Sequence, residues 1–88
     1  MGTPVKFPGM THDFGPPPGR EEDVGRLPCF LNGTCVVSIW DLSNAEIDEI
    51  VRTRRVAVSV MSGTTVLPLY VGSESSVRGV VVDYGRVW

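Results

Sequence analysis

The stretch from Val36 to Ile47, which reads VVSIWDLSNAEI, decides the fold that this sequence predicts. Its first half has the β-branched and aromatic residues of a strand that ends at Trp40. In its second half Ser43 stands three residues before Glu46, the capping-box arrangement that marks the start of a helix. The stretch therefore predicts a strand, a tight corner and a capped helix in direct succession.

The helix is expected to run over about residues 44–53. Leu42 precedes the cap and Ile47 falls at the fourth helical position, which is the pattern of a hydrophobic staple. Ile47, Ile50 and Val51 share one helical face because they are three and four residues apart. We expect this face to be buried.

Charged residues are ordered along the same helix, with acidic residues early and arginines late. This order matches the helix dipole, and Asp48 and Arg52 are spaced to form an ion pair. Arg52, Arg54 and Arg55 form the only basic cluster of the chain. We interpret this cluster as helix termination rather than as a nucleic-acid contact, because the net charge of the chain is −2.

Residues 27–40 are predicted to form a β-hairpin around the Asn-Gly dipeptide at 32–33. A two-residue loop pairs Phe30 with Cys35. A three-residue loop instead places Cys29 directly across from Cys35, close enough for a disulfide. Both loops remain open, and reduced thiols are the default in a cytosolic product.

The second half of the chain contains valine-rich stretches that read as strands. Residues 56–61 alternate with a period of two, and residues 65–71 form a second strand after a Ser-Gly-Thr turn. Pro68 puts that strand at a sheet edge, because proline cannot donate a hydrogen bond to a ladder. Val80–Val82 reads as a final strand. Consecutive valines favour burial on both faces, which a domain this small supplies only by assembling with a partner.

The sequence thus predicts two parts. Residues 1–26 form an extended arm rich in proline and glycine, and residues 27–88 form a small α+β domain. This domain is rich in β-structure: a β-hairpin, one short helix, and then two or three antiparallel strands. In 88 residues there is room for one domain, and a core of this size is marginal without a partner or oligomerisation.

The arm is either a disordered tail or a segment that docks on a neighbouring subunit. We favour docking, because a solvated tail seldom carries two phenylalanines and a methionine among its prolines. Four residues are predicted to bind a protein partner: Phe7, Met10 and Phe14 in the arm, and Trp88 in the domain. We expect the partner to be another protein or further copies of this chain, with no nucleic acid and no membrane.

Neither a membrane span nor a signal peptide is expected. No apolar run approaches the ~18 residues of a membrane span. The first eight residues lack the continuous apolar stretch of a signal peptide. We therefore expect a soluble product that is made in the cytoplasm.

The sequence predicts no catalytic site and no cofactor-binding site. His12 is the only histidine, and it lies beside Asp13 in the arm, which offers no rigid support for a catalytic pair. Cys29, Cys35 and His12 supply three metal ligands without the paired spacing of a zinc site. The sequence has no dinucleotide-binding or phosphate-binding glycine loop. We expect no enzymatic activity, no metal and no cofactor.

Several short motifs also occur together in one group of proteins. They are Leu-Pro at 27–28, the pattern V-V-S-x-W-x-L-S-x-x-E at 36–46, and the pieces FPGMTH and GPP of the arm. In these motifs, over about residues 7–71, the chain resembles small proteins from tailed phages and prophages. It departs from them at Val66-Leu67-Pro68, where a double proline is expected. The resemblance implies no catalytic residue.

Together with the arm, the surplus apolar strands and the absence of catalytic motifs, this resemblance implies a non-enzymatic structural protein of the phage virion, which we expect to be a head cement or decoration subunit. It would bind neighbouring capsid proteins through its arm and exposed strands. The alternative is a phage-encoded regulator or inhibitor that binds a host protein in the cytoplasm. A nucleic-acid-binding module that uses the arginine cluster is the least favoured function, because of the acidic charge balance.

Overall fold

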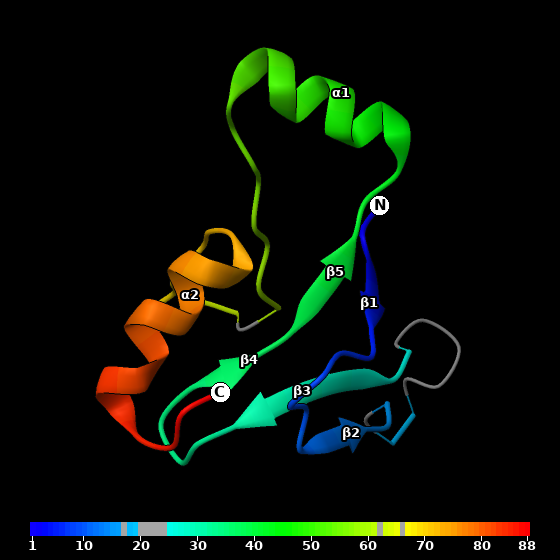
Figure 1. Ribbon diagram of the computed structural model, residues 1–88. Coiled ribbons are helices and arrows are strands. Elements are labelled where there is room, and N and C mark those ends of the chain that lie inside the picture. The colour runs from blue at the N-terminus through cyan, green and yellow to red at the C-terminus, as the bar shows by residue number, and fades with distance from the viewer. Residues whose placement is uncertain (17, 20–24, 62, 66) are drawn as a thin grey trace.

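The structure is a computed structural model, and it describes residues 1–16, 18–19, 25–61, 63–65 and 67–88. The elements of this part of the chain, shown in Figure 1, are β1 (Thr3–Val5), β2 (His12–Phe14), β3 (Leu27–Leu31), β4 (Val36–Val37), β5 (Ile39–Asp41), α1 (Asn44–Thr53), α2 (Glu74–Val81) and the 3-10 helix η1 (Val82–Tyr84).

Two antiparallel sheets hold the strands together. One has three strands in the order β2-β3-β4, and the other has two, β1 and β5. The prediction of a small, β-rich α+β domain is confirmed. The placement of the strands along the chain is different, because in the described residues all of them precede α1.

The predicted strand at Val80–Val82 is wrong, because Val80 and Val81 belong to α2 and Val82 begins η1. Ser73 caps α2, and its hydroxyl accepts a hydrogen bond from the Ser76 amide at 3.2 Å. Val77 and Val81 are four residues apart, so a helix turns both toward the core. Local capping and this spacing outweigh the strand propensity of three consecutive valines.

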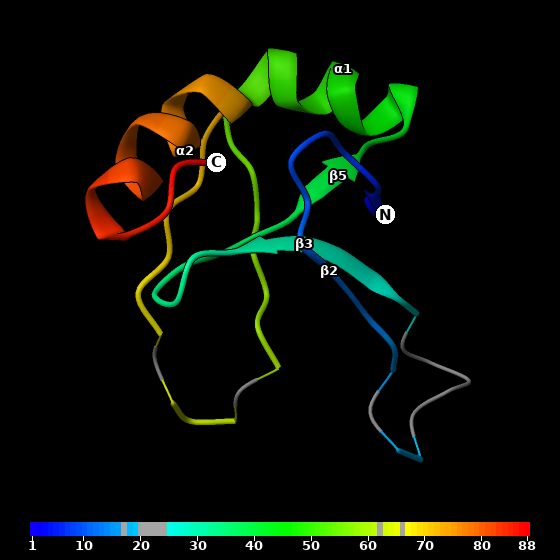
Figure 2. The ribbon, with the colours of Figure 1, turned by 60° about the horizontal axis from the view of Figure 1, so that its bottom comes forward.

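The predicted strands at 56–61 and 65–71 are also wrong in the described residues, where the chain runs without regular structure; position 66 lies outside them. Figure 2 shows this segment as a long excursion between α1 and α2. The described residues 56–60 and 67–69 form no hydrogen bond with other described residues. Alternation of side chains specifies a face, but a strand also needs a neighbouring edge with which to pair.

Two segments of the predicted arm add strands to the sheets of their own chain. β1 pairs with β5 in the register Thr3↔Asp41, and β2 pairs with β3 in the register His12↔Cys29. The amide of Thr11 also donates a hydrogen bond to the Cys29 carbonyl at 2.9 Å. In Figure 1 β1 lies beside β5, and β2 lies beside β3.

The hairpin forms at the predicted place, but both predicted loops are wrong. The register is Phe30↔Val37 and Leu31↔Val36, so residues 32–35 make the connection. The side-chain oxygen of Asn32 accepts hydrogen bonds from the amides of Thr34 at 3.1 Å and Cys35 at 2.8 Å. This Asx-type turn draws the Cys35 amide into the loop.

The two cysteines are free thiols. Cys35 lies in the wider hairpin loop rather than opposite Cys29, and Cys29 pairs with His12 of β2 on the other side of β3. Burial raises the pKa of the Cys29 thiol, and the nearby Asp13 carboxylate raises it further. A raised thiol pKa disfavours the reactive thiolate, so Cys29 serves as a small buried hydrophobic residue.

The core lies between the hairpin and α2. Its buried hydrophobic side chains in the described residues are Cys29, Phe30, Val37 and Val81. Phe30, Val37 and Val81 form one cluster, and partly buried hydrophobic residues pack around it: Phe7, Cys35, Ile39, Val77 and Trp88. A core of this size leaves much of the apolar surface of the chain in contact with solvent.

Helix α1 begins and ends as predicted, but its expected burial is wrong. No residue of α1 is buried, and Ile47 and Val51 are 45% and 73% exposed. The predicted ion pair of Asp48 with Arg52 is also replaced, because Arg52 lies 3.9 Å from Glu49. In Figure 1 the helix stands apart from the sheets and from α2. No other element therefore covers its apolar face.

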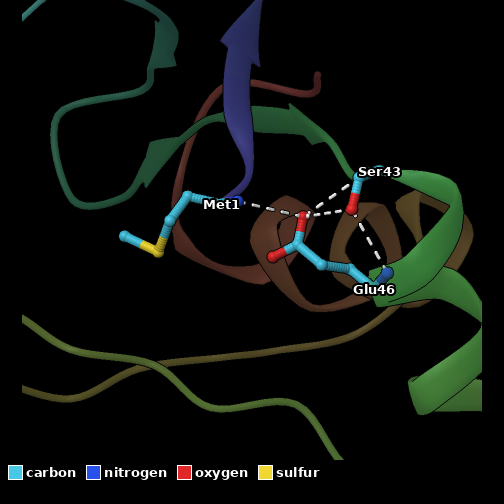
Figure 3. Close-up of polar contacts among 3 residues, drawn as sticks. All are labelled: Met1, Ser43 and Glu46. Atoms are coloured by element: carbon cyan, nitrogen blue, oxygen red, sulfur yellow. Dashed lines mark hydrogen bonds and ion pairs between the residues drawn. The ribbon is translucent and has the colours of Figure 1, made fainter.

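The capping box at the start of α1 is confirmed. The Ser43 hydroxyl accepts a hydrogen bond from the Glu46 amide at 3.2 Å, and the Glu46 carboxylate accepts one from the Ser43 amide at 3.1 Å. Figure 3 shows that the same carboxylate also lies 3.3 Å from the amino-terminal nitrogen of Met1. These contacts link the start of α1 to the strand pair β1–β5.

Replacing the cap should destabilise the fold by a modest amount. Ser43→Ala removes the acceptor for the Glu46 amide, and we expect it to lower the free energy of unfolding by about 1 kcal/mol. Urea unfolding followed by circular dichroism measures this loss. Asn44→Ala, one position further on, is the matched control and should have little effect. Equal stability of Ser43→Ala and the native chain would contradict the role of the cap.

Acid should weaken α1 through Glu46. Hydrogen bonds from the Ser43 backbone and hydroxyl lower the pKa of its carboxyl. Because this pKa is lower in the folded chain than in the unfolded chain, the charged carboxylate stabilises the fold at pH values above the ordinary pKa of a glutamate. The stabilisation is lost as the pH falls through the lowered pKa of the folded chain. Helical circular dichroism during an acid titration should show this step. Glu46→Gln, which does not titrate, should lack it; the same step in that variant would assign it elsewhere.

Candidate partner-binding surface

Two of the four predicted partner-binding residues contact one another. The rings of Phe7 and Trp88 meet edge to face, with their centroids 5.6 Å apart. The Trp88 ring also stacks on Phe30, at a centroid distance of 6.3 Å. Both residues are therefore half-buried against the core of their own chain.

Polar contacts hold Trp88 in this place. The Arg78 guanidinium lies over its ring, 4.0 Å from the centroid, and donates a hydrogen bond to the Trp88 backbone oxygen at 2.6 Å. The indole N–H donates to the carbonyl of Pro8 at 3.4 Å. Trp88 thereby joins α2 to the arm, with the cation–π contact contributing roughly 0.5–1 kcal/mol.

Met10 and Phe14 are placed differently. The amide of Met10 donates a hydrogen bond to the Phe7 carbonyl at 3.2 Å, which closes a turn, and the residue is half-buried. Phe14 is 46% exposed, and its ring stacks on His12 with the centroids 5.6 Å apart. Of the four residues, Phe14 is the one that remains exposed. Partner binding by any of them stays a prediction.

The structure adds an apolar groove that contains none of the four predicted partner-binding residues. The groove has a volume of about 1020 Å³ and lies between residues 34–40, residues 67–72 and α2, with Leu42, Val58 and Tyr84 completing it. Its described lining is mostly hydrophobic, and Glu74 is the one charged residue in it. This composition suits a hydrophobic partner.

Large hydrophobic side chains along the groove remain exposed. The exposed fractions are 63% for Val36, 54% for Val58, 51% for Leu67, 55% for Leu69 and 59% for Val71. The sequence contained a signal for this surface, because its valine-rich stretches carry more apolar residues than so small a core holds.

One polar contact crosses the groove lining. The hydroxyls of Tyr70 and Tyr84 lie 2.7 Å apart, and their ring centroids are 6.0 Å apart. This hydrogen bond raises the pKa of Tyr70. The pair fastens the extended segment 67–72 to η1 and so fixes the width of the groove at one end.

The acidic and metal-binding side chains are dispersed. Within the described residues no three His, Cys, Asp or Glu side chains gather as metal ligands would. Asp13 pairs with Arg26 at 3.2 Å, whereas the His12 ring lies 2.7 Å from the Thr11 hydroxyl. Neighbours in the sequence, His12 and Asp13 therefore have different partners.

A search of the described residues for membrane spans found no helix with the length and hydrophobicity to cross a bilayer. Comparisons with protein-family models, with curated proteins and with solved structures found no match to this chain.

Gly9 is expected to be more sensitive to substitution than other glycines of similar backbone conformation. Its φ is +91°, and an added Cβ would lie 3.0 Å from the Trp88 ring. Gly33 has the same φ of +91° with open space around it, which makes it the matched control. Both Gly→Ala variants should lose roughly 1–2 kcal/mol to backbone strain.

Gly9→Ala should lose more than Gly33→Ala, because it also displaces Trp88 from the core. Thermal unfolding followed by tryptophan fluorescence compares the two variants. Equal losses would mean that the contact of Trp88 with the Pro8-Gly9 turn contributes nothing to stability.

Proposed function

We propose that the chain is a non-enzymatic structural protein of a tailed-phage particle, a head cement or decoration subunit that binds neighbouring capsid proteins. The observation that carries this proposal is the apolar groove with its exposed hydrophobic rim. Contiguous exposed apolar surface of this kind marks sites of protein–protein interaction.

The chemistry of the groove supports a protein partner over a nucleic acid. Its described lining carries a single charge, from Glu74, and the net charge of the chain is −2. A surface that tracks phosphates would instead be basic. The backbone of residues 67–69 has no hydrogen-bond partner among the described residues. It can therefore pair with an extended segment of another protein.

The small core supports a role within an assembly. Four hydrophobic residues are buried among the described residues, and three of them form the core cluster, which is little for a chain of 88 residues. Binding to a partner stabilises the folded state by mass action, so a lattice of capsid proteins would supply part of the missing stability. The phage connection itself rests on the resemblance of the motifs at 27–28 and 36–46.

Purified particles of a phage that encodes this chain test the proposal directly. We expect mass spectrometry to detect the chain in mature particles, and we expect the purified protein to co-sediment with capsids. Absence from mature particles, together with early appearance in the infected cell, would overturn the proposal in favour of a cytoplasmic regulator that binds a host protein.

Charged substitutions in the groove locate the binding surface. Leu69→Asp and Val71→Asp should reduce co-sedimentation with capsids by tenfold or more, because each buries a charge at the interface. Val87→Asp is the matched control, since Val87 is 68% exposed and lies outside the groove lining. Equal binding of all three variants would exclude the groove as the contact surface.

A further inference from the structure

We propose that α1 is a dimerisation helix, which packs antiparallel against α1 of a second copy of the chain around a two-fold axis. This inference concerns a different surface from the groove and does not depend on a role in the virion. It rests on the exposed apolar stripe of α1, on the distribution of its charges and on the backbone conformation of Arg54.

The stripe runs along one face of α1. Ile47, Ile50, Val51 and Arg54 follow the spacing i, i+3, i+4 and i+7, which places them on one side of a helix. Ile47 is 45% exposed, Val51 is 73% exposed and Ile50 is half-buried. A helix of ten residues is marginal by itself in water, and most helices of this length gain stability by packing an apolar face.

The charges beside the stripe favour a second copy in the antiparallel orientation. The acidic residues Glu46 and Asp48 lie near the start of α1, whereas Arg54 and Arg55 lie at its end. Antiparallel packing sets the acidic end of each helix against the basic end of the other. Parallel packing would instead bring like charges together, which is unfavourable.

Three of these four charges are available for such a contact, because Glu46 already pairs with Ser43 and with the amino terminus. Asp48, Arg54 and Arg55 form no ion pair with any described residue of their own chain. A two-fold axis that passes between Ile50 and Val51 brings Arg55 level with the partner's Glu46, and within two residue positions, about 3 Å along the axis, of the partner's Asp48. It also lays the aliphatic stem of Arg54 against the partner's Ile47. Each contact occurs twice, because an isologous interface repeats it.

Arg54 provides an independent indication. It is the C-cap of α1 and has a left-handed backbone, with φ 60° and ψ 26°, and it is the only non-glycine residue with positive φ in the described part of the chain. Glycine is the usual residue at a left-handed helix end, because it adopts this conformation without strain. An arginine that is kept there at a conformational cost indicates a use for its side chain.

The helix dipole explains part of this arrangement. It accounts for acidic residues at the start of α1 and basic residues at its end. It does not account for the exposure of Ile47 and Val51, or for an arginine in place of glycine at the C-cap. A dimer accounts for the order of the charges, for the exposed apolar residues and for the arginine at the C-cap.

Sedimentation velocity on the full chain, from micromolar to millimolar concentrations, tests the inference. We expect a monomer–dimer equilibrium that weakens as salt is added, because ion pairs at a short interface are screened. Val51→Asp should abolish the dimer while the monomer keeps its circular dichroism, since Val51 is 73% exposed. A native chain that stays monomeric throughout would overturn the proposal.

Charge exchange tests the orientation. Asp48→Lys should weaken the dimer by roughly threefold to tenfold, because Asp48 lies within about 3 Å along the axis of the partner's Arg55, in two symmetric places. Adding Arg55→Glu should restore the affinity. Asp83→Lys is the matched control, because it makes the same change in charge on η1, away from α1, at a carboxylate that has no ion pair with a described residue, and it should leave the dimer intact. Equal weakening by Asp48→Lys and Asp83→Lys would rule out this geometry.

Arg54→Gly separates the two effects of this residue. Glycine relieves the left-handed strain, so the melting temperature of the dilute monomer should rise. The same change removes the side chain from the interface, so the dimer should dissociate more readily. A variant that is more stable and dimerises as well as the native chain would show that Arg54 has no place in the interface.

Discussion

The docking of α2 on the hairpin is the contact on which the rest of the structure depends. Val81 is 2% exposed and packs with Phe30 and Val37, one of the two residue pairs of the β3–β4 ladder. Asn32 reinforces this contact: its side-chain oxygen shapes the hairpin loop, and its side-chain nitrogen donates to the Val81 carbonyl at 3.3 Å. Trp88 covers the same cluster from the arm side. Without this packing, neither the short strands nor α2 would be stable alone.

Because the whole core is concentrated at this one place, the remaining apolar residues have nothing of their own chain to cover them. The chain that leaves α1 reaches α2 through a long excursion, and the described valines and leucines of this segment line the groove or are exposed to solvent. Helix α1 follows β5, away from the core, and carries its own exposed apolar stripe. The two surfaces lie on different elements, so the capsid contact and the dimer that we propose would not exclude one another.

The parts of the fold that the sequence predicted correctly depend on neighbours within a few residues. The capping box of Ser43 and Glu46 set the start of α1, and the Asn-Gly pair at 32–33 located the hairpin. The hairpin register could not be predicted, because it depends on which backbone amides donate hydrogen bonds to the side-chain oxygen of Asn32. The valines of α2 favour a strand by propensity, but the Ser73 cap and the spacing of Val77 and Val81 place them in a helix. For the candidate surface, Phe14 alone among the four predicted residues is exposed, and the groove was missed.

The sequence by itself therefore determined the α+β class, the limits of α1 and the position of the hairpin, since hydrogen bonds between close neighbours encode them. Only the tertiary structure decided which segments meet. The arm pairs with β3 and β5, Phe7 and Trp88 join the core, and the valines at 56–60 remain without a strand partner. The physical reason is that a pattern of side chains specifies which face is apolar, whereas the partner of that face depends on the closure of long loops and on competition among all the apolar segments of the chain.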